Sequence, residues 1–441
     1  MVCHVVEAMV LNNMYKHTAF MTVSTAVRLL SGMVLFIVLA RILGPQDFGR
    51  LMYQFTVTSI AMLVLDYGFG QQLLREIGRA PERIAHLMGE IFIAKLWLTL
   101  IILAASVFYL FIGVRTVVDI MLFWSLLFAN MFVSFGDYFM VGFRGIGQFH
   151  KETRVATISS VLHFALITSI AMLGGGLLMV ALGFVVSRAI YLGLSWLAYR
   201  TEIGKLVLNE AGVSKIVHTL KSGFPYAADT GFTNFFYQVD TLIVNYYLGL
   251  VGVGVYQAGM RFLQGAMQFA PVLGNVYLPA LASNATQPQK LKALAAKLNV
   301  QMLTIGMAGW AFFTFAGKWL THFAYGAKFA ILTPLWPYIG LLMLVRFVTG
   351  SQGILLTASG SQKVRVYAQI AALAVLWLSS PWLIHHFGLA GMFMSLTLTI
   401  STLLLIFIIT LLIKHQPSGF SFVTTFLALI SATIGIVILH G

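Results

Sequence analysis

Residues Ile37 to Arg79 read IVLARILGPQDFGRLMYQFTVTSIAMLVLDYGFGQQLLREIGR, two apolar runs separated by a short segment rich in turn-forming residues. The first run is predicted to end as a helix at Leu43-Gly44-Pro45, because glycine and proline both interrupt helices. Gly49 is expected to close the tight turn that follows. The pattern predicts two helices joined as a hairpin.

The second apolar run begins at Leu51 and contains one carboxylate, Asp66. It is expected to end through Gly68 and Gly70, beyond which arginines follow at Arg75, Arg79 and Arg83. A carboxylate inside an apolar helix is costly and points to a functional role.

Composition assigns the chain to the membrane. Of its 441 residues, 59% are hydrophobic and only 9% are charged, whereas a soluble domain has about 25% charged residues. The net charge of +14 is carried by short loops between apolar runs, where membrane topology places basic residues. We therefore expect the lipid bilayer as a partner and no nucleic acid. The single cysteine, Cys3, excludes an internal disulfide.

Crossing the hydrocarbon core takes about 20 apolar residues per helix. On that criterion the sequence predicts an all-α, polytopic membrane protein with twelve spans, at 19–43, 51–74, 87–112, 117–142, 153–175, 177–199, 222–248, 252–281, 297–320, 332–358, 364–385 and 388–413. The apolar segment 420–440 is a candidate thirteenth.

Basic residues are distributed unevenly between the two sides. With the N-terminus in the cytoplasm, seventeen of the 27 Lys and Arg residues fall at the inner face, five at the outer face and five within spans. The positive-inside rule therefore predicts this orientation.

Glycine positions suggest two copies of one unit. Leu43-Gly44 and Gly49 recur at the same spacing as Leu248-Gly249 and Gly254. Two further pairs keep the same order along the chain: Gly176 with Gly388, and Gly147 with Gly360. We expect two six-helix bundles, 1–211 and 212–413, as parallel repeats with a cleft between them, and an extra segment, 414–441.

Eight charged residues lie well inside the predicted spans, away from their ends. We expect the cations to bind substrate and the acids to couple an ion gradient: Arg28, Lys95, Arg188, Arg261 and Arg346, and Asp66, Asp229 and Asp240.

Two interpretations of these charges are open. Arg28 with Asp66, and Asp240 with Arg261, are either parts of a hydrated cavity or ion pairs that lock neighbouring helices. Lys95 either faces the cleft or extends its amine towards the cytoplasm. Glu90 and Asp137 lie near span ends and are expected at the interface.

Five intramembrane cations suit an anionic substrate, because guanidinium groups match phosphate oxygens. A carboxylate such as Asp66 can exchange H⁺ or bind Na⁺. We expect no cofactor beyond such an ion and no metal site, since His385-His386 lacks a third ligand. The sequence also lacks a phosphate-binding loop and the hydrolase motifs GxSxG and HExxH, so no enzymatic activity is predicted.

The run from Ala40 to Gly49, with Asp66-Tyr67-Gly68 and Arg75-Glu76, resembles the start of the O-antigen type (Wzx-like) polysaccharide repeat-unit flippases of the multidrug/oligosaccharidyl-lipid/polysaccharide exporter superfamily. Segments 145–148 and 325–329 are also similar to that family. The resemblance runs over most of 19–413.

This resemblance implies alternating access and transfer of an undecaprenyl-pyrophosphate-linked oligosaccharide, in lipopolysaccharide synthesis, from the cytoplasmic to the periplasmic leaflet of the bacterial inner membrane. It implies that Arg28 and Arg261 receive the pyrophosphate, and that polymerase and chain-length proteins are partners. A twelve-span member ends inside the cell, so a thirteenth span would depart from the pattern.

Two other functions are compatible with the sequence. A drug or cation antiporter of the same superfamily is expected to have a cavity rich in carboxylates rather than cations. A membrane glycan polymerase or ligase needs a large outer loop, and no predicted outer connection exceeds about a dozen residues.

Overall fold

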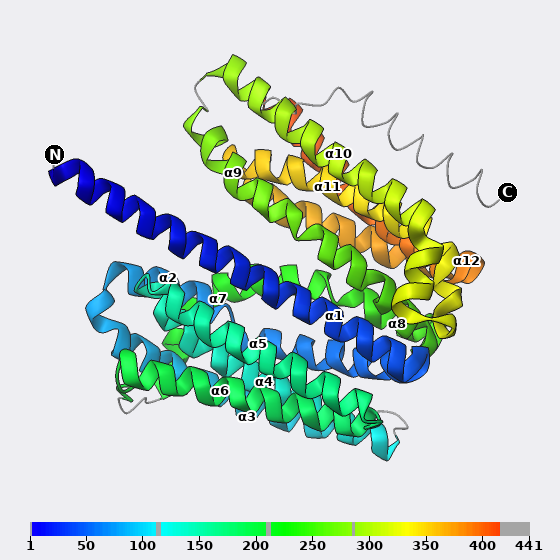
Figure 1. Cartoon of the computed structure of the whole chain (residues 1–441), viewed down its shortest axis with the longest axis horizontal. Helices are drawn as coiled ribbons and strands as arrows, with labels where there is room; N and C mark the ends of the chain where they lie inside the picture. The colour runs from blue at the N-terminus through cyan, green and yellow to red at the C-terminus, as the bar shows by residue number, and fades with distance from the viewer. Residues whose placement is uncertain (1, 112–115, 209–212, 285–286, 415–441) are drawn as a thin grey trace. The chain divides into compact units, whose positions relative to one another are not determined.

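The computed structural model describes residues 2–111, 116–208, 213–284 and 287–414, and it is built from helices (Figure 1). Their bounds are α1 Val2–Asp66, α2 Phe69–Arg79, η1 Pro81–Arg83, α3 Ile84–Leu110, α4 Val117–Gly145, α5 Phe149–Met172, α6 Leu177–Glu202, α7 Val213–Phe236, α8 Val239–Met267, α9 Phe269–Ser283, α10 Pro288–Leu320, η2 Thr321–Tyr325, η3 Ala327–Leu335, α11 Trp336–Ala358 and α12 Gln362–Ile413. The described part contains no strand. The segment 420–440 lies outside the described residues.

The helices have the length and composition of membrane spans. Within the described ranges, nine helical stretches are long and apolar enough to cross a membrane. Three of them have 50, 54 and 50 residues and bend at a non-helical glycine: Gly44 in α1, Gly249 in α8 and Gly388 in α12. Counting each bent stretch as two arms yields the twelve spans predicted. The protein is therefore an all-α, multi-pass membrane protein.

The glycine repeat has the same backbone conformation in both copies. Gly44 has φ 77° and ψ 174°, and Gly249 has φ 65° and ψ −169°. Residues other than glycine are strained in this region of φ/ψ space. Gly147 and Gly360 also match, at φ 76° and 70°. Gly176 and Gly388 differ, at φ −63° and 56°, so that pair does not repeat structurally.

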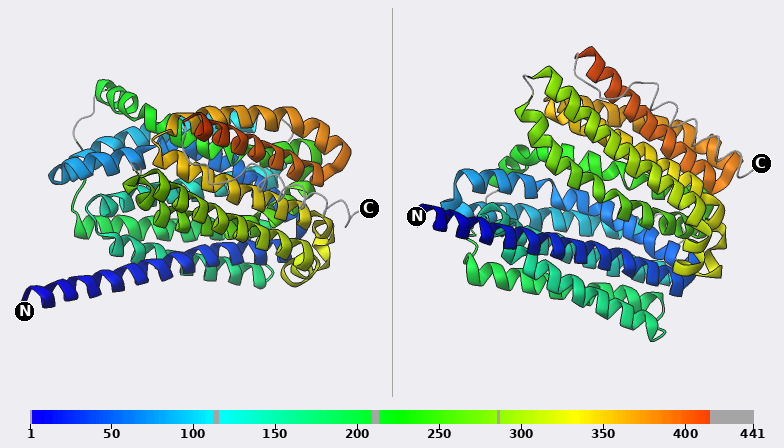
Figure 2. Two further views of the ribbon diagram at one scale, coloured as in Figure 1. Left: turned by 90° about the horizontal axis from the view of Figure 1, so that it is seen from above. Right: turned by 45° about the horizontal axis from the view of Figure 1, so that its top comes forward.

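The chain divides into two compact units. Unit 1 comprises 1–43 and 50–238, and unit 2 comprises 44–49 and 239–441. Unit 1 has a core formed mainly by α2, α3, α4 and α6, in which α4 and α6 run side by side. In unit 2, α11 packs against both α10 and α12 (Figure 2). Buried aliphatic residues such as Leu344 and Leu404 join α11 to α12.

Helix α7 belongs to unit 1, whereas the sequence placed the domain boundary at 211/212. Ser222 accepts a hydrogen bond from Gln72 Nε2 at 3.2 Å, and Tyr226 Oη accepts one from Arg75 Nη1 at 2.6 Å. Gly68 lies against the backbone of Tyr226, where a Cβ would be 2.5 Å from the carbonyl carbon. These contacts with α2 and its N-terminal cap explain why the boundary between units follows Gln238.

The turn 44–49 packs within unit 2 although both helical arms that flank it belong to unit 1. A Cβ on Gly49 would lie 1.8 Å from the carbonyl oxygen of Leu250, and a Cβ on Gly254 would lie 1.9 Å from that of Pro45. The contacts are reciprocal. Gly49 packs against the carbonyl of Leu250, which directly follows Gly249, and Gly254 packs against the carbonyl of Pro45, which directly follows Gly44. We call 44–49 and 249–254 the two elbows. The sequence predicted that Gly49 closes a turn, and this was wrong. Gly49 is helical, and it is the residue of its elbow that contacts the Leu250 carbonyl.

Candidate functional site

Asp66 and Lys95 form an ion pair in unit 1. Lys95 Nζ lies 2.9 Å from Asp66 Oδ1 and donates a hydrogen bond to Ser134 Oγ at 2.5 Å. The Ser134 hydroxyl in turn donates to Asp66 Oδ1, so the three side chains form a closed triangle. Lys95 is also 5.3 Å from the centre of the Phe135 ring. The cation bonded to Asp66 is therefore Lys95 and not Arg28.

The two partners of this pair differ in accessibility. The side chain of Lys95 is 2% exposed, whereas that of Asp66 is 53% exposed. Asp66 is the last residue of α1, because Tyr67 and Gly68 have φ 44° and 70° and end the helix there. The Asp66 carboxylate therefore contacts the buried Lys95 amine through one oxygen, while the rest of the group is exposed and accessible to an ion.

A second polar cluster lies one helical turn away on α4. Asp137 follows Ser134 by three residues, and such residues share one helix face. Its carboxylate accepts a hydrogen bond from Tyr191 Oη at 2.5 Å and interacts electrostatically with Arg188, both on α6. Asp137 also interacts electrostatically with Asp66 and Lys95. The two clusters thus form one continuous polar array in unit 1.

Sequence reasoning placed Asp137 at the membrane interface. The structure places it eight residues before the end of α4, which is about 12 Å along the helix axis. His163 was missed altogether: its Nδ1 lies 2.7 Å from Ser187 Oγ, beside Arg188. The polar array on α4 could have been found from the spacing of Ser134 and Asp137, because residues three apart lie on one face of a helix.

Arg28 lies elsewhere in unit 1 and is half-buried. It interacts electrostatically with Glu152, which is ion-paired with Arg144 at 3.0 Å. Arg28 therefore belongs to a charged group near the C-terminal end of α4 and the N-terminal end of α5, and Glu152 of this group also interacts electrostatically with Asp137.

Asp240 is buried in unit 2, with 5% exposure. Its carboxylate accepts hydrogen bonds from Tyr256 Oη and the Thr241 amide, both at 2.6 Å, and from Thr241 Oγ1 at 3.1 Å. Gln257 Nε2 donates to Thr241 Oγ1 at 2.6 Å. Arg346 on α11 interacts electrostatically with both Asp240 and Tyr256.

The pairing of Asp240 with Arg261 expected from the sequence is absent. The two arms of α8 meet across the bend at Gly249 through two hydrogen-bonded pairs, Thr241 with Gln257 and Asp240 with Tyr256. Arg261 lies five residues further along the helix than Tyr256, about 7.5 Å. There its Nη1 donates to Gln264 Oε1 at 3.3 Å, and its guanidinium interacts electrostatically with Tyr325. The side chain of Asp229 is not among those that the structure describes.

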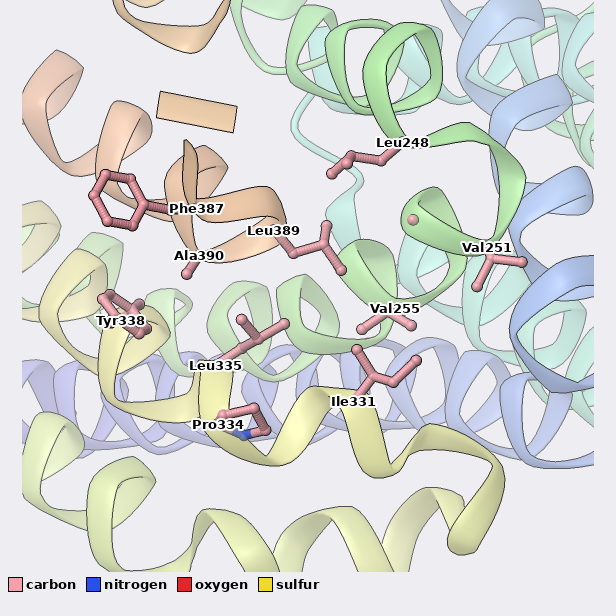
Figure 3. A pocket seen from close by; sticks show the side chains of 11 residues that line it. Leu248, Val251, Val255, Ile331, Pro334, Leu335, Tyr338, Phe387, Leu389 and Ala390 are labelled. Carbon is pink, nitrogen blue, oxygen red and sulfur yellow. The ribbon is translucent and has the colours of Figure 1, made fainter. Parts of the chain in front are cut away.

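Unit 2 also contains an apolar cavity of about 580 Å³. Side chains from α8, η3, α11 and α12 surround it, including Leu248, Leu335 and Phe387 (Figure 3). No charged residue lines it. The cavity suits an apolar group and is distinct from the charged clusters. Within the described residues, no group of three His, Cys, Asp or Glu side chains could hold a metal ion.

The family described as "Polysaccharide biosynthesis protein" matches residues 14–285. The chain belongs to this family. No curated protein matches its sequence. Its fold is similar to that of the lipid II flippase MurJ, with 14% identity and a TM-score of 0.73 over 95% of this chain and 92% of that one. This agrees with the fold that the sequence resemblance implies.

Two transporters of the MATE family also share the fold. One, of the MOP superfamily, has a TM-score of 0.69 and 14% identity over 94% of this chain and 95% of that one. The other, a point mutant of the Vibrio cholerae transporter VcmN, has a TM-score of 0.58 and 16% identity over 93% and 99%. The fold of the chain is thus that of MATE transporters and MurJ.

Proposed function

We propose that this chain is a secondary transporter of the bacterial inner membrane that flips an undecaprenyl-pyrophosphate-linked oligosaccharide repeat unit, of the O-antigen type, from the cytoplasmic to the periplasmic leaflet. The observation that carries the proposal is a set of cations within apolar helices. Lys95, Arg188, Arg261 and Arg346 lie in stretches long and apolar enough to cross a membrane, and Arg28 lies in α1, within the first span predicted from the sequence. Cations at such depth are costly in lipid and suit a substrate with a pyrophosphate. Membership of a polysaccharide biosynthesis family supports the sugar part of the substrate.

Transport proceeds by alternating access, with the N-terminus in the cytoplasm. The orientation rests on the excess of basic residues in the loops on that side. Arg28 and Arg261 bind the pyrophosphate, and Lys95, Arg188 and Arg346 complete the cationic path.

Movement is coupled to H⁺ or Na⁺ through Asp66, Asp229 and Asp240. The argument is strongest for Asp66, whose open carboxylate side can take up a cation. An ion bound there competes with Lys95 for the carboxylate, and the released ammonium becomes available to an anion. Ion binding and substrate binding are thereby linked through one pair.

A drug or cation antiporter is the second candidate, since MATE transporters share the fold. The buried carboxylate Asp240 favours it, because acids of this kind bind protons and organic cations. The five cations favour the lipid-linked anion instead.

The decisive experiment compares wild type with Arg28→Ala and Arg261→Ala. Proteoliposomes receive a fluorescent undecaprenyl-pyrophosphate oligosaccharide, and transfer between leaflets is followed by quenching from one side. We expect transfer by wild type, loss of transfer in both variants, and unchanged transfer in Arg79→Ala, which removes an exposed cation outside the proposed binding residues. Normal transfer in both variants would remove the pyrophosphate role. Export of cationic drugs without any lipid transfer would establish the antiporter instead.

A further inference from the structure

A recess in unit 1 is lined by none of the intramembrane charges used above. It has a volume of about 350 Å³ and opens between α5 and α6, near the end of α4. Its rim is polar and includes Lys151 and Arg154 from α5 and Glu202 from α6, whereas its walls are apolar, with Ile158, Leu194 and Leu197. The recess therefore combines a charged mouth with an apolar interior, at one end of two membrane-spanning helices.

The charges at the mouth leave one cation without an ion pair. Lys151 Nζ lies 2.5 Å from Glu202 Oε2, and Arg144 is paired with Glu152. Arg154 is exposed and has no hydrogen bond or ion pair within the described part of the chain. The mouth thus carries a net positive charge and five guanidinium N–H donors available to a ligand.

The apolar walls indicate how the ligand is attached. Ile158 and Leu197 are 48% and 53% exposed and lie on the membrane-facing part of their helices, one to two turns beyond the cationic mouth. On α6, Arg200 stacks on the Trp196 ring at 5.3 Å, the kind of pair that marks a lipid headgroup region. Basic pockets between membrane helices at this level are suited to anionic headgroups.

We propose that this recess binds an anionic glycerophospholipid, with its phosphate on Arg154 and its acyl chains along Ile158 and Leu197. The phosphate accepts hydrogen bonds from the Arg154 guanidinium. Lys151 supports it only in part, because Glu202 holds its ammonium. With the orientation proposed above, the lipid comes from the cytoplasmic leaflet. The site is independent of the substrate path, since none of the intramembrane cations lines it.

The test measures lipid binding to the full chain by native mass spectrometry and by thermal unfolding in detergent. Dioleoyl phosphatidylglycerol is titrated against dioleoyl phosphatidylcholine, which has the same chains and no net charge, and against inorganic phosphate. Arg154→Gln removes the charge at the mouth, and Arg154→Lys retains it. Arg79→Gln is the matched control, because Arg79 is exposed at the same end of unit 1 and lies outside the recess.

We expect wild type to bind phosphatidylglycerol in preference to phosphatidylcholine, and Arg154→Gln to weaken that binding about five-fold, the effect of one cation near a membrane surface. Arg154→Lys and Arg79→Gln should stay near the wild-type value. Equal weakening in Arg154→Gln and Arg79→Gln would reduce the effect to bulk attraction and overturn the proposal. Protection by inorganic phosphate equal to that by phosphatidylglycerol would also overturn it, since the site would then hold a free anion.

Discussion

Alanine at either elbow glycine should destabilise the protein, and the structure supplies the magnitude. A Cβ on Gly49 would lie 1.8 Å from a carbonyl oxygen, and one on Gly254 would lie 1.9 Å from another. Carbon–oxygen contacts of this type settle at about 3.3 Å, so each substitution requires the elbows to separate by about 1.5 Å. The atom in the way is backbone and cannot rotate aside.

The expected cost exceeds the gain in helix propensity. Overpacking of this kind costs about 1–3 kcal/mol, and rigid backbone on both sides places these sites at the upper end. Alanine is a better helix former than glycine, which offsets about 1 kcal/mol of this loss in the free energy of unfolding. The net loss is about 2 kcal/mol for each variant. Gly350→Ala in α11 is the matched control, because nothing lies within 4 Å of its Cβ, and it should gain about 1 kcal/mol.

Thermal unfolding of the purified protein, followed by tryptophan fluorescence, measures the difference. Gly49→Ala and Gly254→Ala should each melt several degrees below wild type, and Gly350→Ala should melt above it. The double variant should lose less than the two single losses combined, because one separation of the elbows relieves both clashes. An elbow variant that melts at or above wild type would refute the close approach of the two bends.

Three further outcomes are expected. Asp66→Asn should lower the free energy of unfolding by somewhat less than the ~3–5 kcal/mol measured for fully enclosed pairs, since the Asp66 side chain is 53% exposed. The double variant Asp66→Asn with Lys95→Met should recover most of this loss. No recovery would argue against the ion pair. The same Asp66→Asn variant should alter the pH or Na⁺ dependence of lipid transfer in proteoliposomes, and an identical dependence would remove Asp66 as a coupling residue. Tyr256→Phe should cost about 1–3 kcal/mol in thermal unfolding by leaving a buried carboxylate short of a donor, whereas Tyr246→Phe, 81% exposed, should be neutral.

Features that repeat along the chain were accessible to sequence reasoning. Glycine marks the bends at Gly44 and Gly249 because few other residues tolerate their conformation, and their common spacing to Gly49 and Gly254 revealed the repeat. The role of those second glycines was not accessible. A sequence shows where a side chain is missing, but it does not show which backbone occupies the vacated space.

The partners of the intramembrane charges were harder to predict for a related reason. Counting residues establishes depth along a helix, about 1.5 Å for each, but not the rotation of that helix about its axis. Asp66 was therefore considered with Arg28, while the structure pairs it with Lys95. For Asp240, equal distance from the bend at Gly249 points to Ala258, two residues beyond the observed partner, Tyr256. The roles of all eight charges in transport stay predictions.

The exchange of contacts between the elbows bears on the origin of the chain. Each elbow supplies a glycine to the carbonyl of the other, which is the reciprocity of an interface between two identical subunits. A half-length protein with a single elbow would already carry both sides of that interface and could dimerise through it. Tandem duplication of its gene would join the two copies in one chain, so that their association no longer depends on protein concentration.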